Sequence, residues 1–507
     1  MKLSELFLLK RFWLIVGLFV VILFGVLGVY SSHQNNTTFP EDFLFGSASA
    51  AYQIEGYSKA DGKGVSIWDD LVENHLDMVL DHRSADTGPD SYKFYKDDVM
   101  VMKEIGFNMY RFSIAWSRIM PDGELSSLNE AGLKYYDNLI NELLANDIIP
   151  MVTMYHWDHP KDIQKLGGPL NRLFVDYFKE YARVLFQRFG DRVKYWITVN
   201  EPSIFCTFSY TTETWGAAIN VTGGEYYCAH NLLLAHATVY RMYQEEFASQ
   251  GGKIGLSLHS RGYLPKNPDS DSDREAVKVG FLTDLGWSAH PVFSLSGDYS
   301  SVLRKFIDEK SKHEGRAWSR LPHFTKEDKK LLRGSADFLG LNYYTSRLVE
   351  MDPNPFNGVS FILNDTRIIE TPAKHWPQAK SEWLFSAPEG FRALLNWIKK
   401  EYNNPDVIIT ENGWSDDGQL VDDDRIEYLR RHLTEILEAI KLDGCNVRGH
   451  TTWSILDNFE WMQGFTEKFG IVSWDEDSKQ RRPKNSASFL RKVISSRQIP
   501  SDSPSSH

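Results

Sequence analysis

The chain has 507 residues, of which 42% are hydrophobic and 24% charged, a balance that is typical of globular proteins and excludes a disordered or collagen-like chain. Its net charge of -12 argues against a nucleic-acid partner, because binding a phosphate backbone needs a broad positive surface. Only three cysteines occur, which excludes a scaffold built from disulfides.

The N-terminal segment has the pattern of a signal peptide or a signal anchor. Residues 12–30 carry no charge, are almost wholly apolar and follow Lys2, Lys10 and Arg11. The run is longer than the ~7–15 apolar residues of a cleaved signal and close to the ~20 of a spanning helix. We therefore expect residues 1–36 to be a signal or an anchor with a short spacer. The preceding basic residues favour a cytosolic N-terminus, so the rest of the chain is expected in the secretory pathway, either secreted or extracellular, or as the lumenal part of a single-pass membrane protein.

Glycosylation motifs and two cysteines are compatible with a lumenal location. Asn-X-Ser/Thr tripeptides begin at Asn35, Asn36, Asn220 and Asn364. Cys206 and Cys228 bracket a short loop-like stretch and could form a disulfide in an oxidising compartment, which would leave Cys445 unpaired. Three free thiols are the alternative in a chain of this size.

One domain is predicted over residues 37–495, followed by a disordered polar tail over 496–507. Short β-rich apolar segments alternate with stretches of helical period, as in consecutive βα units around a parallel sheet. Eight strands are predicted at 43–48, 109–113, 149–155, 194–199, 253–258, 336–341, 407–410 and 448–453. Helices are predicted at 171–189, 229–247, 390–402 and 424–442, among others. The expected fold is α/β, a single (β/α)8 TIM barrel with extended loops at the carboxyl ends of the strands.

Polar and acidic residues follow four of these strands. The third, fourth, sixth and seventh run into Tyr155-His156-Trp157-Asp158, Asn200-Glu201-Pro202, Asn342-Tyr343-Tyr344 and Glu411-Asn412-Gly413. Because the carboxyl ends of barrel strands share one mouth, groups far apart in the chain can face one pocket there.

Glu201 and Glu411 are therefore a candidate catalytic pair. Cleaving a glycosidic bond with retention needs a carboxylate that attacks the anomeric carbon and a carboxylic acid that protonates the leaving oxygen, ~5–5.5 Å apart. Mutual repulsion and partial burial should raise the pKa of one group so that it stays protonated near neutral pH. Position alone does not say which is which, and a glutamate taken at random is more often a solvated surface group.

Seven motifs together resemble glycoside hydrolase family 1, the β-glucosidase family, and among its members an animal-type secreted or membrane-anchored one. A lone Asn-Glu-Pro is a weak signal, but seven motifs in the family's order are specific. The resemblance runs from Phe39 to about Phe489. In chain order the matches are Phe45-Gly46 with Ala51-Tyr52-Gln53-Ile54-Glu55-Gly56, Tyr110-Arg111-Phe112-Ser113, Tyr155-His156-Trp157-Asp158, Thr198-Val199-Asn200-Glu201-Pro202, Asn342-Tyr343-Tyr344, Ile409-Thr410-Glu411-Asn412-Gly413 and Trp453-Ser454-Ile455-Leu456-Asp457-Asn458-Phe459-Glu460-Trp461.

The resemblance implies roles for individual residues. The glutamate of Thr-X-Asn-Glu-Pro is the acid/base in the family and that of Thr-Glu-Asn-Gly is the nucleophile, which implies Glu201 and Glu411. Arg111 and Tyr344 are implied to lie against the nucleophile, and Asn200 to hold the sugar 2-hydroxyl. The full set implied to bind the substrate is Gln53, His156, Asn200, Asn342, Tyr344, Trp453, Glu460, Trp461 and Phe469, with Trp453 as the platform beneath the ring.

No cofactor and no metal are expected, because two carboxylates and water suffice for this mechanism. His156, Asp158 and His159 could be read as metal ligands, but no HExxH motif or cysteine pair supports that reading. Trp453 and Trp461 could instead be core residues. The expected partner is a small-molecule or oligosaccharide β-glycoside, with membrane contact only through an uncleaved N-terminal segment, and the sequence gives no oligomeric state.

The implied activity is that of a retaining β-glycosidase acting on β-glucosides through a covalent glycosyl-enzyme, with β-galactosides and β-fucosides as further candidate substrates. A thioglucosidase, which uses the same nucleophile, is one alternative. Plant thioglucosidases resemble this family but have Gln at the acid position, so Glu201 argues for O-glycosides. The alternative stays open because thioglucosidases that keep the acid exist in the family. A catalytically inactive, membrane-anchored binding protein is a second alternative, although such members tend to lose a catalytic glutamate. A 6-phosphoglycosidase is disfavoured because Glu460 would repel a phosphate.

The chain departs from the family pattern at four places. Lys93, Pro169 and His450 stand where the family usually has His, Trp and Tyr, and residues 209–224 lack the usual Gly-Tyr-Gly segment. We expect these differences to shape mostly the outer wall of the pocket, on the leaving-group side, so the identity of the leaving group stays open.

Overall fold

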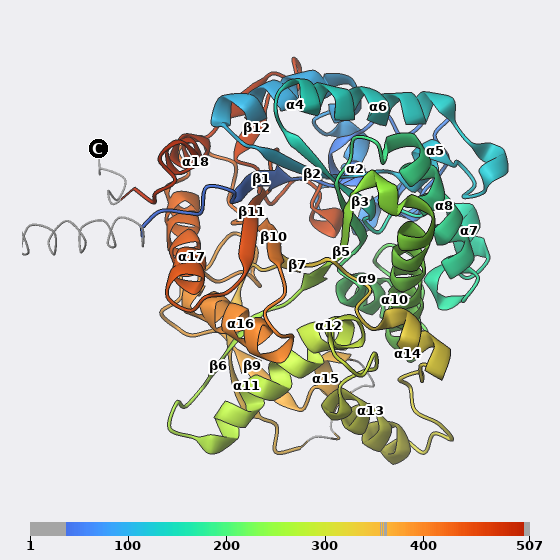
Figure 1. Ribbon diagram of the computed structural model, residues 1–507, viewed down its shortest axis with the longest axis vertical. Helices are drawn as coiled ribbons and strands as arrows, with labels where there is room; N and C mark the ends of the chain where they lie inside the picture. Colours follow the sequence, from blue (N-terminus) through green and yellow to red (C-terminus); the bar gives the residue numbers. More distant parts are fainter. Residues whose placement is uncertain (1–36, 355, 357, 359–361, 501–507) are drawn as a thin grey trace, which may run out of the picture.

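Eight parallel strands close into a barrel in the computed structural model, which describes residues 37–500 except 355, 357 and 359–361 (Figure 1). Around the barrel each strand pairs with the next along the chain, and the last pairs with the first. The strands are β1 (Leu44–Ala48), β2 (Met109–Ser113), β3 (Ile149–Tyr155), β4 (Tyr195–Asn200), β5 (Lys253–His259), β7 (Phe338–Asn342), β10 (Val407–Asn412) and β11 (Val447–Trp453). All eight predicted strands and the predicted TIM barrel are confirmed.

Helices surround the strands, as the alternating sequence pattern predicts (Figure 1). In α17, residues Ile426, Leu429, Leu433 and Ile436 recur every three or four positions and are buried, so this helix turns one apolar stripe inward. The helices are α2 (Ala51–Ile54), α3 (Ile67–Asn74), α4 (Ser91–Ile105), α5 (Trp116–Ile119), α6 (Glu130–Ala145), α7 (Lys161–Lys165), α8 (Phe174–Phe189), α9 (Pro202–Thr211), α10 (Gly224–Met242), α11 (Asp271–Thr283), α12 (Leu285–Phe293), α13 (Ser301–His313), α14 (Lys326–Leu332), α15 (Ile362–Asp365), α16 (Pro388–Glu401), α17 (Asp423–Lys441) and α18 (Asn485–Ser496).

Two small sheets lie outside the barrel and were not predicted. One consists of β6 (Gly262–Pro265), β8 (Ser346–Met351) and β9 (Ile368–Thr371), and α11 and α16 pack against it. The other pairs β12 (Val472–Trp474) with β13 (Arg481–Pro483). Strands of three to six residues in long loops carry too little alternation to be recognised in the sequence.

The two ends of the barrel are chemically different. Met109, Met151, Ile197, Phe338 and Ile408 come from the amino-terminal parts of five strands and form a separate buried apolar cluster. This cluster fills the barrel floor, so polar groups can gather only toward the carboxyl ends of the strands.

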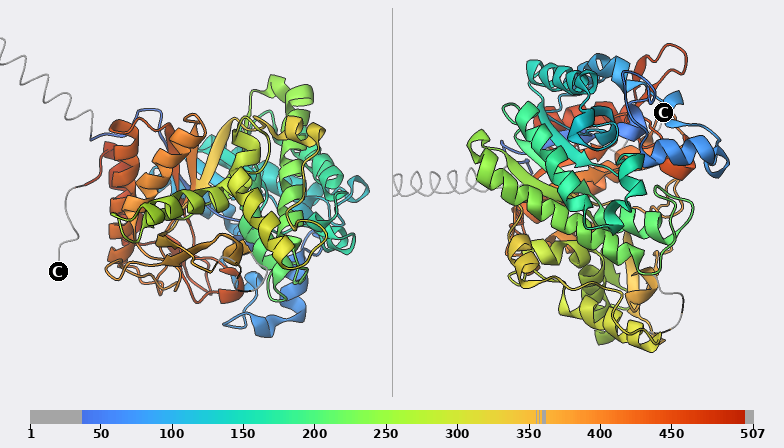
Figure 2. Two further views of the ribbon diagram at one scale, coloured as in Figure 1. Left: turned by 90° about the horizontal axis from the view of Figure 1, so that it is seen from below. Right: turned by 90° about the vertical axis from the view of Figure 1, so that its right-hand side faces the viewer.

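The start and the end of the described chain lie side by side, next to α18 (Figures 1 and 2). The backbone N–H of Phe39 donates to the carbonyl of Arg497 at 2.9 Å, and Thr38 and Gln498 form a β-bridge. The chain is therefore packed to about residue 500, and residues 501–507 of the predicted tail lie outside the described part.

Cys206 on α9 and Cys228 on α10 form a disulfide, the first of the two alternatives that the sequence left open, and Cys445 is a buried free thiol. Within residues 37–500, no helix has the length and apolarity that a membrane span requires. The apolar run at 12–30 lies outside the described residues, so the signal-or-anchor prediction stays a prediction.

Candidate active site

A cavity of about 410 Å³ opens at the carboxyl ends of the barrel strands. Most of the residues predicted to face one pocket line it, although they are up to 313 positions apart in the chain (469 − 156). The predicted residues on its wall are His156, Glu201, Tyr344, Glu411, Trp453, Glu460, Trp461 and Phe469. Gln53, Arg111, Asn200 and Asn342 lie directly behind this wall and are hydrogen-bonded to it or to its neighbours.

Both oxygens of the Glu411 carboxylate have a donor. The Arg111 Nη1 group lies 2.6 Å from Oε1, and the Tyr344 hydroxyl donates to Oε2 at 2.7 Å. Burial raises the pKa of Glu411, but the buried guanidinium and the two hydrogen bonds oppose that rise. The arrangement thus stabilises an ionised, fixed carboxylate.

Glu201 is held differently. It lies between β4 and α9, just before Pro202, and its backbone has a positive φ of 43°, which is uncommon for a residue other than glycine. Its carboxyl lines the cavity. Asn342 Nδ2 donates to its Oε1 at 2.8 Å. Burial, followed by the charge of Glu411, raises the pKa of Glu201 to about 8. At neutral pH Glu201 therefore carries a proton, whereas a guanidinium opposes the rise in the pKa of Glu411, a difference that the sequence could not show.

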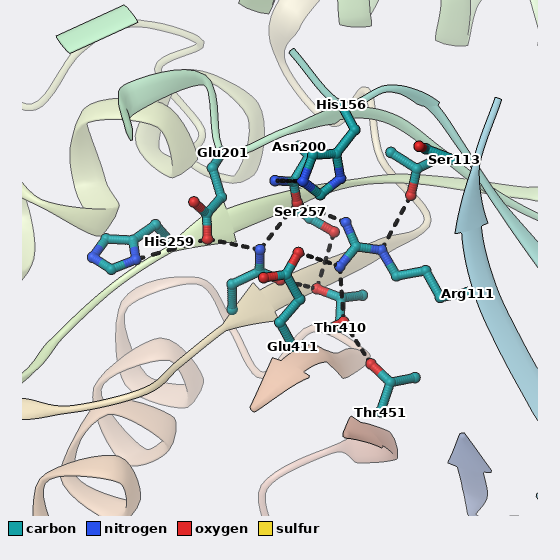
Figure 3. Close-up of polar contacts among 12 residues, drawn as sticks. Arg111, Ser113, His156, Asn200, Glu201, Ser257, His259, Thr410, Glu411 and Thr451 are labelled. Atoms are coloured by element: carbon teal, nitrogen blue, oxygen red, sulfur yellow. Dashed lines mark hydrogen bonds and ion pairs between the residues drawn. The ribbon is translucent and has the colours of Figure 1, made fainter. Parts of the chain in front are cut away.

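A hydrogen-bond network fixes the groups between the two carboxyls (Figure 3). Asn200 Oδ1 accepts from Arg111 Nη2 at 2.6 Å and from Asn342 Nδ2 at 3.0 Å, and Thr410 Oγ1 donates to Asn342 Oδ1 at 2.7 Å. These contacts set the orientation of both amides. Asn200 Nδ2 therefore points toward His156, whose Nε2 lies 3.2 Å away on the cavity wall.

Among the predicted site residues, three buried polar atoms have no hydrogen-bond partner in the described structure: Gln53 Oε1, His156 Nδ1 and Glu460 Oε2. Gln53 is held from its other side, because its Nε2 donates to the carbonyl of Phe459 at 2.8 Å. Burial and the charge of Arg111 lower the pKa of His156 well below its ordinary value, so its imidazole is neutral. Unpartnered buried polar atoms are costly, and a ring of sugar hydroxyls would supply the missing partners.

Close packing explains why the residue after Asn412 is a glycine. A Cβ on Gly413 would lie 1.9 Å from the Trp453 carbonyl oxygen, which belongs to the neighbouring strand. Only glycine lets β10 and β11 approach so closely at the point where Glu411 and Trp453 enter the cavity.

The outer part of the cavity was largely missed from the sequence. Its wall includes Ile204, Phe208, Trp215, His259, Arg261, Trp383 and Met462. His259 could have been found, because it ends β5 and so obeys the same strand-end rule as the other site residues. The tryptophans could not, since they lie in long loops whose course the sequence does not reveal.

The expectation about the outer wall was wrong for Lys93, Pro169 and His450, none of which lines the cavity. His450 is buried in the barrel wall with Nε2 3.0 Å from Asn412 Oδ1. Only the departing segment 209–224 contributes, through Trp215.

The metal reading of His156, Asp158 and His159 gains no support. Both ring nitrogens of His159 are within hydrogen-bond distance of other groups, Tyr155 OH and Gln164 Oε1, each at 2.8 Å. Among residues 37–500 no cluster of three or more His, Cys, Asp or Glu side chains has a geometry suited to a metal ion.

The chain matches the family model described as Glycosyl hydrolase family 1 over residues 35–499. It is 47% identical to Myrosinase 1 of Brevicoryne brassicae over 465 residues, covering 90% of this chain and 98% of that protein. The solved structure of an aphid myrosinase has a TM-score of 0.87 and 46% identity over 90% of this chain and 99% of that one. A rice β-glucosidase variant in a covalent complex with Glc has a TM-score of 0.84 and 36% identity, over 90% and 99% of the two chains.

We expect Glu411→Gln to lower the pKa of Glu201 from about 8, because the variant removes the neighbouring negative charge. The pKa should stay above its ordinary value, since burial is the larger cause. Carbon-13 NMR of labelled glutamate carboxyls measures it directly, with Glu327→Gln on the exposed face of α14 as the control. An unchanged pKa of Glu201 would mean that the two carboxyls do not interact.

Proposed function

The chain belongs to glycosyl hydrolase family 1 and is a glycosyl hydrolase, and from this premise we propose that it is a retaining β-glycosidase that cleaves β-glucosides. Glu411 is the nucleophile and Glu201 the acid/base. The observation that carries this proposal is the unequal environment of the two buried glutamates: a guanidinium contacts Glu411, whereas an amide contacts Glu201.

The two residues act in a double displacement. In the first step a Glu411 oxygen bonds to the anomeric carbon, the bond from that carbon to the leaving oxygen breaks, and Glu201 gives its proton to the leaving oxygen. In the second step Glu201 takes a proton from water, whose oxygen bonds to the anomeric carbon as the bond to Glu411 breaks. Glu201 is again protonated at the end.

The inner cavity supplies groups for one sugar ring. Gln53, His156 and Glu460 each present an unpartnered polar atom for the outer hydroxyls, and Asn200 Nδ2 is placed for the 2-hydroxyl, where contacts strengthen in the transition state. Trp453 provides a flat apolar face on the same wall. Asn342 keeps Glu201 and Asn200 in place rather than facing the cavity itself. Trp461 and Phe469 complete the wall, and the same set can hold β-galactosides or β-fucosides.

The outer cavity favours an apolar leaving group. Phe208 and Trp383 are 36% and 43% exposed there, and Ile204 and Met462 lie on the same wall. Exposed aromatic rings around a pocket bind flat apolar groups. The thioglucosidase alternative remains open because two of the similar proteins are named myrosinases. The alternative of an inactive binding protein is disfavoured, because both glutamates and their hydrogen-bond donors are in place.

We also propose that residues 1–36 direct the domain into the secretory lumen, as a signal or as an anchor. A disulfide between Cys206 and Cys228 suits an oxidising compartment. Asn220 and Thr222 are both exposed, so this tripeptide is accessible for glycosylation. The tripeptide at Asn364 is less suited: Asn364 lies in α15, and Thr366 is only 7% exposed.

Replacing each glutamate should separate their roles. Glu411→Gly should reduce kcat on every glycoside by about 10⁴-fold or more, and added azide should restore cleavage with an inverted product. Glu201→Ala should slow alkyl glucosides by about 10²–10⁴-fold but spare dinitrophenyl glucosides, because a good leaving group needs no proton. Steady-state kinetics and NMR of the products check both. Equal losses on the two substrate types in Glu201→Ala would refute the acid role.

The leaving atom can be tested on the unmodified protein. Protonated Glu201 assists departure of a poorly activated alkoxide, a step that thiolates hardly need, so kcat/KM should be higher for an O-glucoside than for a thioglucoside of the same aglycone. A higher kcat/KM for the thioglucoside would promote the thioglucosidase alternative and leave the nucleophile and the sugar site as proposed.

Expression in cells that glycosylate secretory proteins tests the compartment. Glycopeptide mass spectrometry should find a glycan at Asn220, lost in Thr222→Ala and kept in Thr222→Ser, because the transferase needs the hydroxyl. Asn364→Gln is the matched control and should leave the Asn220 peptide unchanged. A protein with unmodified Asn220 that is digested by protease outside intact microsomes would contradict the proposal.

A further inference from the structure

His259 occupies a place next to the acid/base that the mechanism above does not use. It is the last residue of β5, and its Cα is paired in register with that of Asn342 on β7. The backbone N–H of Glu201 donates to the carbonyl of Ser257, two positions before His259. Because alternate residues of a strand face the same side, His259 points inward with Ser257, toward Glu201 (Figure 3).

The His259 imidazole faces the Glu201 carboxyl but is not hydrogen-bonded to it. Its Nδ1 lies 3.8 Å from Glu201 Oε1, beyond hydrogen-bond distance, and its side chain is 11% exposed on the cavity wall. Its Nε2 is buried and has no partner in the described chain. Buried N–H groups without a partner are rarer in proteins than buried acceptors without one, so the favoured tautomer carries the hydrogen on Nδ1, which faces the carboxyl, and leaves the lone pair on Nε2.

We propose that His259 is a positioning residue that donates an Nδ1–H hydrogen bond to Glu201 whenever this carboxyl is ionised. The inference rests on the proposed function, in which Glu201 alternates between acid and base. As an acid it needs one donor, Asn342, on Oε1. As a base it carries a full charge inside a buried site, and a second donor then stabilises it. A movement of about 1 Å, the range of ordinary side-chain motion, closes the contact.

A neutral imidazole suits this role better than a cation would. A permanent positive charge at this place would keep Glu201 ionised and prevent it from acting as an acid. Burial, then the charge of Arg261, lowers the pKa of His259 to about 3, so it stays neutral at working pH. The titratable groups that face the pair are Arg111, Asp284, Tyr344, Glu411 and Glu460 around Glu201, and Arg261, Arg347 and Glu370 around His259.

The pH dependence of kcat/KM on an aryl glucoside tests the proposal, because its high-pH limb reports ionisation of the acid in the free enzyme. Removing a donor to the ionised form raises the pKa of Glu201. His259→Phe and His259→Leu should therefore both move this limb to higher pH by about half a unit or more. For His259→Asn, which keeps an N–H donor on a shorter side chain, the pH of this limb should lie between the values for these variants and the wild type.

His230→Phe is the matched control, because His230 is buried on α10, bonded to Tyr299 at 3.1 Å, and does not line the cavity. Its limb should not move. In a Glu201→Ala background, His259→Phe should cause no further change in kcat/KM on a dinitrophenyl glucoside, because its effect passes through Glu201.

The inference is overturned if the high-pH limb of the kcat/KM profile stays in place or moves to lower pH in both His259→Phe and His259→Leu. It is also overturned if His259→Phe lowers kcat/KM as much in the Glu201→Ala background as in the wild type. A wild-type protein that hydrolyses no glycoside would instead refute the proposed function, so the two failures are distinguishable.

Discussion

The ion pair between Arg111 and Glu411 is the interaction on which the rest of the site depends. Burying two charges is expensive, and the cost is offset only when each charge is paired and its remaining hydrogen-bonding groups are satisfied. Arg111 is fully buried, and its guanidinium also contacts Thr153, Asn200 and the carbonyl of Thr410. One side chain of β2 thus connects β3, β4 and β10 across the inside of the barrel. Removing either charge would leave the other buried and unpaired, so the pair is both structural and chemical.

The difference between the two glutamates follows from this pair. Arg111 stabilises the charge of Glu411, and that charge then opposes ionisation of Glu201, whose own carboxyl contacts an amide and faces a neutral imidazole rather than a guanidinium. Two identical side chains at the ends of two parallel strands therefore lie in different electrostatic environments, and burial with the charge of Glu411 raises the pKa of Glu201 to about 8. The barrel makes this possible because its apolar floor leaves only the mouth for charged groups, and because a closed parallel sheet brings strand ends together in a fixed register.

The sequence predicts the barrel well because its signals are local. Each strand is a short apolar run between turns, and helices such as α17 have a repeating apolar stripe, so all eight strands are found within a few residues of their observed ends. The glutamates follow from the rule that strand ends share a mouth. Their protonation states do not, because these depend on burial and on Arg111, 300 positions from Glu411 (411 − 111). The outer wall is the least predictable part: Trp215 and Trp383 reach it from loops, whereas Lys93, Pro169 and His450, chosen by motif comparison, do not.

The central claim is that Glu411 forms a covalent bond to the sugar while Glu201 does not. A dinitrophenyl 2-deoxy-2-fluoro-β-glucoside tests it most directly. The fluorine slows both displacements, but the good dinitrophenolate leaving group speeds the first, so the covalent glycosyl-enzyme accumulates. Peptide mass spectrometry after brief exposure should find the fluorosugar on the peptide that contains Glu411, with stoichiometric release of dinitrophenolate. Label on a different residue, or continued turnover with no label at all, would contradict the account.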